Sequence, residues 1–66
     1  MIYFVLNSDN TIIKIYRQRG RVEVMLIRSS ESLSFAGYNL DHYPAAAWLR
    51  IGDRLDPVKF EIFGKF

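Results

Sequence analysis

The segment that decides the fold is IIKIYRQRGRVEVMLI, residues 12–27. Residues of the β-branched and aromatic types fill both of its ends, and this composition is typical of strands. Gly20 lies between the two ends and suits the positive backbone dihedral angle of a tight hairpin loop. We therefore predict a β-hairpin over residues 11–28, with its loop at Arg19 and Gly20.

One register of this hairpin separates apolar from mixed side chains. Opposed residues of an antiparallel pair lie on the same face of the sheet. A loop at Arg19 and Gly20, or a four-residue loop over 18–21, places Ile15 opposite Val24 and Ile13 opposite Leu26. The other face then carries Lys14, Tyr16, Glu23 and Met25.

A first hairpin precedes this segment. Residues 2–6, IYFVL, read as a strand, and NSDN at residues 7–10 reads as a turn. Asn and Asp tolerate left-handed backbone and form local hydrogen bonds in turns. The sequence thus predicts a β-hairpin over residues 2–17, in which Phe4 faces Ile13 and Ile2 faces Ile15.

The C-terminal half contains the predicted helix. Pro44 suits a first helical turn, three alanines follow it, and Trp48, Ile51 and Leu55 have helical spacing. These features predict a short helix over about 42–51 with Trp48 buried against the sheet. Residues 33–38 are compatible with a loop or with a short edge strand.

A last strand follows the predicted helix. The segment VKFEIF, residues 58–63, alternates apolar and polar residues, which predicts that Val58, Phe60 and Ile62 point inward.

These elements predict a single domain over residues 1–66 of the α+β class. In it a short helix covers one face of a small antiparallel sheet. The alternative is a small SH3-like or OB-like β-barrel, in which PAAAWL, residues 44–49, forms only one helical turn.

The composition excludes several kinds of structure. The chain of 66 residues has no cysteine, so it can form neither disulfides nor a thiolate zinc site, and we expect a cytoplasmic setting. Its longest fully apolar runs, IYFVL and AAAWL, are far shorter than the ~20 residues of a membrane-spanning helix. We expect no membrane association.

The sequence lacks a recognisable set of catalytic residues. His42 is the only histidine, and its neighbour Asp41 does not by itself supply a nucleophile or a second poised titratable group. No dinucleotide or phosphate-binding glycine motif is present. We therefore predict no enzymatic activity, no catalytic residue, no cofactor and no metal site.

Positive charge is concentrated in one part of the chain. Residues 14–28 contain five basic residues and one acidic residue, a balance of +4, against a net charge of +2 for the whole chain. Basic surfaces with interspersed aromatic residues bind nucleic acids, and Tyr, Met and Arg are also enriched at protein interfaces. The candidate binding face consists of Lys14, Tyr16, Arg17, Arg19, Arg21 and Met25.

The expected function is that of a small interaction or regulatory protein that binds a protein partner. It would act like an inhibitor or an adaptor, of the kind that phages and mobile elements encode. The alternative is a nucleic-acid-binding protein that uses the basic segment 14–28. We also expect a homo-oligomer, formed through an uncovered sheet face or through the tail near Phe63 and Phe66.

Overall fold

The computed structural model describes residues 1–58 and the backbone of residues 61–63. Its elements are β1 (Ile2–Leu6), β2 (Ile12–Tyr16), α1 (Arg19–Arg28), β3 (Ser34–Tyr38), η1 (Pro44–Trp48), β4 (Arg54–Asp56) and β5 (Glu61–Phe63). This arrangement confirms the small α+β class, because the sheets are open and form no closed barrel. Within the described residues, no helix has both the length and the apolar character needed to cross a membrane.

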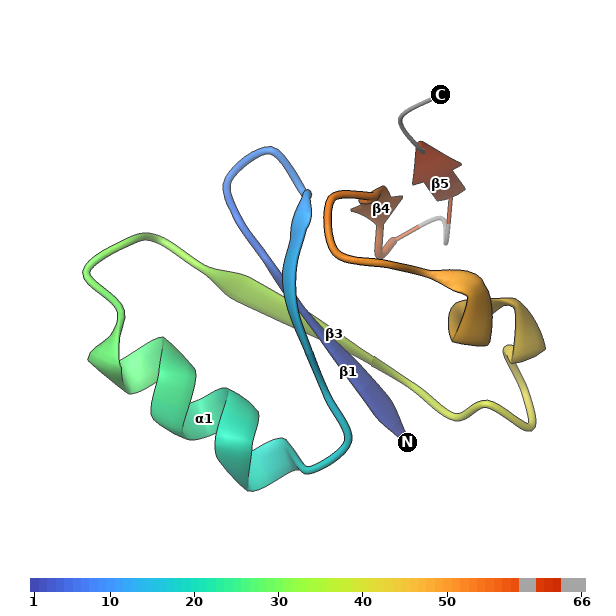
Figure 1. Cartoon of the computed structure of the whole chain (residues 1–66), viewed down its shortest axis with the longest axis horizontal. Helices are drawn as coiled ribbons and strands as arrows, with labels where there is room; N and C mark the ends of the chain where they lie inside the picture. The colour runs from blue at the N-terminus through green and yellow to red at the C-terminus, as the bar shows by residue number, and fades with distance from the viewer. Residues whose placement is uncertain (59–60, 64–66) are drawn as a thin grey trace.

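The main sheet has the strand order β2-β1-β3, with β1 in the centre and antiparallel to both neighbours. The strands β2 and β3 are therefore parallel to each other, and α1 lies between them in the chain (Figure 1). Parallel strands cannot be joined by a tight turn and need a crossover connection, usually a helix. Residues 33–38, which the sequence leaves open, contain β3 at an edge of this sheet.

The first hairpin is confirmed, but its register differs from the predicted one. Asn7 Oδ1 accepts hydrogen bonds from the backbone N–H groups of Asp9 and Thr11, and Asn10 has a φ of 60°. The register moves from Leu6↔Ile12 to Val5↔Lys14, so Ile13 is the extra residue of a β-bulge. As a result Phe4 faces Ile15 rather than the predicted Ile13.

The predicted hairpin over residues 11–28 is wrong, because its second half forms the helix α1. The residues VEVMLI fit both the two-residue period of a strand and the 3.6-residue period of a helix, since the apolar residues at 22, 25 and 26 also lie on one face of a helix. Local strand propensity is a weak preference that tertiary context can override. Here β1 pairs with β2 and β3 along its two edges, and the segment between them serves as the crossover.

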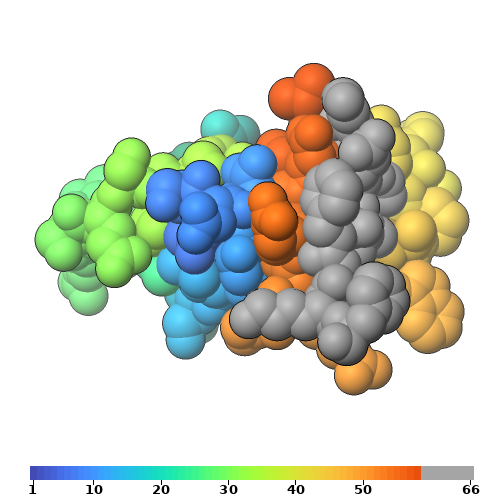
Figure 2. Space-filling model, turned by 90° about the horizontal axis from the view of Figure 1, so that it is seen from above, coloured from blue at the N-terminus to red at the C-terminus, as the bar shows by residue number. Residues whose placement is uncertain are grey.

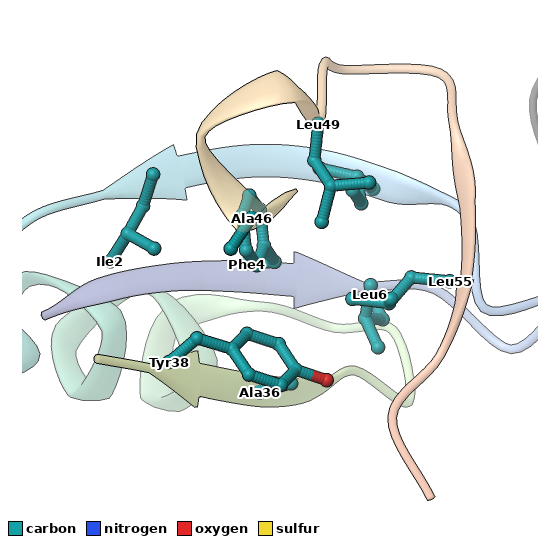
Figure 3. Close-up of a cluster of buried hydrophobic side chains, with 9 residues drawn as sticks. Ile2, Phe4, Leu6, Ala36, Tyr38, Ala46, Leu49 and Leu55 are labelled. Atoms are coloured by element: carbon teal, nitrogen blue, oxygen red, sulfur yellow. The ribbon is translucent and has the colours of Figure 1, made fainter. Parts of the chain in front are cut away.

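The two faces of the main sheet have different covers. One face packs against residues 44–55, and the resulting core contains Ile2, Phe4, Leu6, Ile12, Ala36, Tyr38, Ala46, Leu49 and Leu55 (Figure 3). The helix α1 contacts β1 and β2, and its only fully buried side chain is Val22. Val5 is also completely buried but lies outside that core cluster, as expected for the alternate face of β1. The fold thus has a main core on one face and a smaller packed layer under α1.

The predicted helix over 42–51 is shorter and tighter than expected. Residues Pro44–Trp48 form a 3₁₀ helix that begins at Pro44, as the proline predicts. Ala46 and Leu49 are buried, whereas the Trp48 side chain is 80% exposed and Ile51 is also exposed. The prediction that Trp48 is buried is therefore wrong, because a 3₁₀ helix has three residues per turn and turns a different set of side chains inward.

The last strand is only partly confirmed. β5 covers Glu61–Phe63 and pairs with β4, so the two form a separate small sheet beside the main one. Val58 lies in a turn and is 92% exposed, so its predicted inward orientation is wrong. Phe60 lies outside the described residues, and the side chain of Ile62 is likewise not described.

The backbone of β3 comes close to an aromatic ring of β1. Gly37 is the cross-strand partner of Tyr3, and a Cβ atom at Gly37 would lie 2.8 Å and 2.9 Å from two ring carbons of Tyr3. Replacement of Gly37 by Ala forces this ring to move. We expect the free energy of unfolding to fall by roughly 1–3 kcal/mol, measured by urea denaturation.

Gly20→Ala is the matched control for this substitution. A Cβ atom at Gly20 would have no neighbour within 4 Å, and Gly20 lies inside α1. Alanine is the better helix former, so this variant should be as stable as the wild type or slightly more stable. Equal stability of the Gly37→Ala and Gly20→Ala variants would show that the Tyr3 ring does not restrict β3.

Candidate functional site

A hollow of about 700 Å³ lies beside α1. This volume falls within the ~300–1,000 Å³ that is usual for ligand pockets. The hollow is lined by Tyr16, Gln18, Gly20, Arg21, Val24, Met25, Arg28 and Ser29. All of these residues come from the end of β2, from the connection that follows it, and from α1 with its C-cap residue.

The wall of the hollow is apolar. Tyr16 is the last residue of β2, and its hydroxyl group lies 3.5 Å from Met25 Sδ, to which it donates. Met25 and Tyr16 are half-buried, whereas Val24 is 49% exposed, and Ile27 nearby on the helix is 83% exposed. Exposed apolar side chains next to a concave surface are typical of binding sites.

Two arginines supply the charge of the hollow. Arg21 and Arg28 are seven residues apart, which is about two helical turns or ~10 Å along α1, and both therefore lie on the same side of the helix. Among the described residues, neither arginine has a carboxylate partner. Glu23, the one acidic residue of α1, instead pairs with Arg19 at 3.2 Å.

The start of α1 increases the positive potential around the hollow. Its N-cap residue Gln18 makes no capping hydrogen bond through its side chain, and the first turn contains no acidic residue. The N-terminus of a helix carries a partial positive charge, which favours nearby carboxylates and disfavours nearby cations. Arg17, Arg19 and Arg21 stand in this region, so the local field favours an anionic group from outside the chain.

The structure brings together half of the six residues predicted for the binding face. Tyr16, Arg21 and Met25 line the hollow. Lys14 lies on β2, opposite Val5, and is exposed, while Arg17 lies in the connection to α1. Arg19 is on α1 but outside the lining, and it pairs with Glu23.

The other five lining residues lie outside the predicted face, and two of them, Val24 and Arg28, are excluded from it by the predicted strand over residues 21–28. In a strand Val24 and Arg28 point away from Arg21 and Met25, whereas in a helix all four lie along one side. The signal that could have identified them is the helical spacing of positions 21, 25 and 28.

A second group of exposed apolar residues lies in the C-terminal half. Those that follow β3 are Tyr43, Trp48, Ile51 and Val58. Figure 2 shows the yellow surface at the opposite end of the molecule from the green surface near the end of α1, while orange surface also lies in the middle, beside the blue N-terminal strands. None of these four residues lines the hollow.

The described residues offer little for metal or acid-base chemistry. They contain no group of three or more His, Cys, Asp or Glu side chains that could hold a metal ion. Burial raises the pKa of Tyr38, and the nearby Tyr43 and Asp56 raise it further, but Tyr38 belongs to the core rather than to the hollow. His42 is exposed. The arrangement beside α1 is suited to binding through apolar contact and positive charge.

A comparison of the chain with protein-family models, with curated proteins and with solved structures found no match.

Proposed function

We propose that this chain is a small non-enzymatic interaction protein that binds a protein partner through the hollow beside α1. Its expected action is that of an inhibitor or an adaptor in a cytoplasmic setting. The observation that supports this proposal is the combination of an apolar wall, formed by Tyr16, Val24 and Met25, with the charges of Arg21 and Arg28, which have no carboxylate partner in the described part of the chain. Tyr, Met and Arg are the residues that protein interfaces favour.

The apolar content of the site favours a protein over a nucleic acid. Sequence-independent nucleic-acid binding depends on many phosphate contacts from basic residues. Among the described residues, the lining of the hollow includes two arginines, and residues 29–66 have a charge balance of −1, from four basic and five acidic residues. Nucleic-acid binding by the basic segment 14–28 remains the alternative.

The test is capture of partners from a lysate of the source organism, with and without nuclease. We expect the immobilised wild-type chain to retain a protein after nuclease treatment, and we expect Val24→Glu to lose it. Val24 is exposed and Glu is a good helix former, so this variant should keep its fold, as its circular dichroism spectrum and thermal melting would verify.

Ile51→Glu is the matched control, because it places the same charge on an exposed apolar residue outside the hollow. Capture should be unchanged in this variant. Loss of capture with Ile51→Glu, but not with Val24→Glu, would show that the interface lies in the C-terminal half rather than at the hollow. Loss of all capture upon nuclease treatment would instead favour the nucleic-acid alternative.

Self-association stays a prediction. Neither sheet face is left bare along its full length, because residues 44–55 cover one face and α1 contacts the other. Of the proposed tail contacts, the side chain of Phe63 and the whole of Phe66 lie outside the described residues.

A further inference from the structure

We infer that the partner segment which fits the hollow is an acidic amphipathic helix, with two carboxylates one heptad apart and large apolar residues between them. This inference rests on the proposed function and specifies the chemical class of the partner. It uses the positions of Arg21, Val24, Met25 and Arg28 along α1.

The spacing of the two arginine positions along α1 favours a helical ligand. Arg21 and Arg28 are about 10 Å apart along the helix axis, at roughly 1.5 Å per residue. A second helix lying along α1 presents two carboxylates at the same distance when they are seven residues apart. An extended segment fits less well, because its side chains on one face recur at about 7 Å and 13 Å.

The apolar wall specifies what lies between the two carboxylates. Val24 and Met25 occupy the middle of the interval between Arg21 and Arg28, and the Tyr16 ring stands beside Met25. On the partner helix, the third and fourth positions after the first carboxylate face this interval. Leucine or another large apolar residue there would enter the hollow, as in the common recognition of an amphipathic helix in a groove.

Electrostatics favours an acidic partner over a neutral one. Arg17, Arg19 and Arg21 crowd the positive end of α1, and Glu23 pairs with Arg19. A carboxylate bound beside Arg21 would lie close to the start of α1, which has no side-chain cap. There it would reduce the repulsion between the arginines and the positive end of the helix dipole. Complementary charge of this kind determines partner choice and orientation.

The experiment uses synthetic helical peptides and fluorescence anisotropy on the full chain. The acidic peptide is alanine-based and fluorescein-labelled, with glutamates seven residues apart and leucines at the third and fourth positions between them. A second peptide carries lysines in place of the glutamates, and a third carries its glutamates five residues apart. We expect the acidic peptide to bind roughly tenfold or more tightly than either of the others.

Exchange of the charges supplies the decisive measurement. The double variant Arg21→Glu, Arg28→Glu should lose the acidic peptide and gain the lysine peptide, whereas Arg50→Glu should behave like the wild type. Arg50 is exposed and lies outside the hollow, so it is the matched charge-reversal control. Recovery of binding with the lysine peptide shows that the double variant is folded and that the two arginines face the ligand charges.

Three results would overturn the inference. The first is equal binding of the acidic and lysine peptides, and the second is an unchanged preference in the double variant. The third is displacement of the acidic peptide by an equal concentration of a mixed-sequence single-stranded oligonucleotide. If the peptides fail but Val24→Glu still abolishes nuclease-resistant capture, the acidic helix is rejected and the proposed protein-binding function stands.

Discussion

Replacement of Phe4 by Ala is expected to remove a large part of the protein's stability at room temperature. Phe4 is completely buried in the central strand β1, and its ring centroid lies 6.0 Å from that of Tyr38 on the neighbouring strand. Truncation of a buried Phe typically costs ~3–5 kcal/mol. At ~0.05–0.15 kcal/mol per residue, a chain of 66 residues has a total stability of roughly 3–10 kcal/mol, of which this loss is about a third or more.

Circular dichroism and urea denaturation would measure this effect. The control is Phe4→Leu, which keeps most of the apolar volume and should fold with a loss of roughly 1 kcal/mol. A cooperative Phe4→Ala transition at the wild-type midpoint would contradict the position of Phe4 at the centre of the core.

The second large effect is expected at Leu55. Its side chain is completely buried in the same core, and its backbone N–H donates to the Asn10 carbonyl oxygen at 2.9 Å. Nearby, the backbone N–H of Ile12 donates to the carbonyl oxygen of Asp53, and the backbone N–H of Gly52 donates to the carbonyl oxygen of Ile12, each at 2.8 Å. These bonds attach residues 52–55 to the start of β2. Leu55→Ala should lower the free energy of unfolding by about 2–5 kcal/mol, measured by urea denaturation.

Trp48→Ala is the comparison that makes this measurement informative. The Trp48 side chain is larger than that of Leu55 but is 80% exposed, so its removal should change the free energy of unfolding by no more than ~0.5 kcal/mol. The sequence pattern predicts the opposite order, with Trp48 as the buried anchor. A Trp48→Ala variant less stable than Leu55→Ala would support that pattern and contradict the structure.

The N-terminal hairpin was predictable because its signals are local. Residues 2–6 and 12–16 are rich in β-branched and aromatic residues, and Asn7 and Asn10 have the chemistry that a tight turn requires. The register was not predictable, because the bulge at Ile13 adds one residue to β2 without any glycine or proline to mark it. Pairing rules alone could not place that extra residue.

The helical conformation of α1 depends on the whole sheet and not on its own residues alone. Val22, Val24 and Ile27 are good strand formers, and Gly20 resembles a hairpin loop. What makes the segment a helix is that β3 occupies the free edge of β1, so the chain must cross between two parallel strands. The pattern along the chain fits a strand and a helix alike, and by itself it does not decide between them.

The same limit explains the candidate site. The concentration of positive charge was visible in the sequence, and Tyr16, Arg21 and Met25 were identified from it. Arg28 and Val24 join them only after the segment is wound into a helix. The burial of Leu49 instead of Trp48 likewise follows from a 3₁₀ turn that the run of alanines does not specify.

Residues 44–55 and α1 cover opposite faces of the main sheet, so the two layers can diverge in sequence independently. The main core contains no residue of α1, and Val22 is the only residue of α1 that is fully buried. Mutations on the outer side of α1 can therefore accumulate without loss of the fold, while the sheet and residues 44–55 remain under selection for packing. The proposed binding surface can therefore change in one layer of the molecule, and the scaffold beneath it tolerates the change.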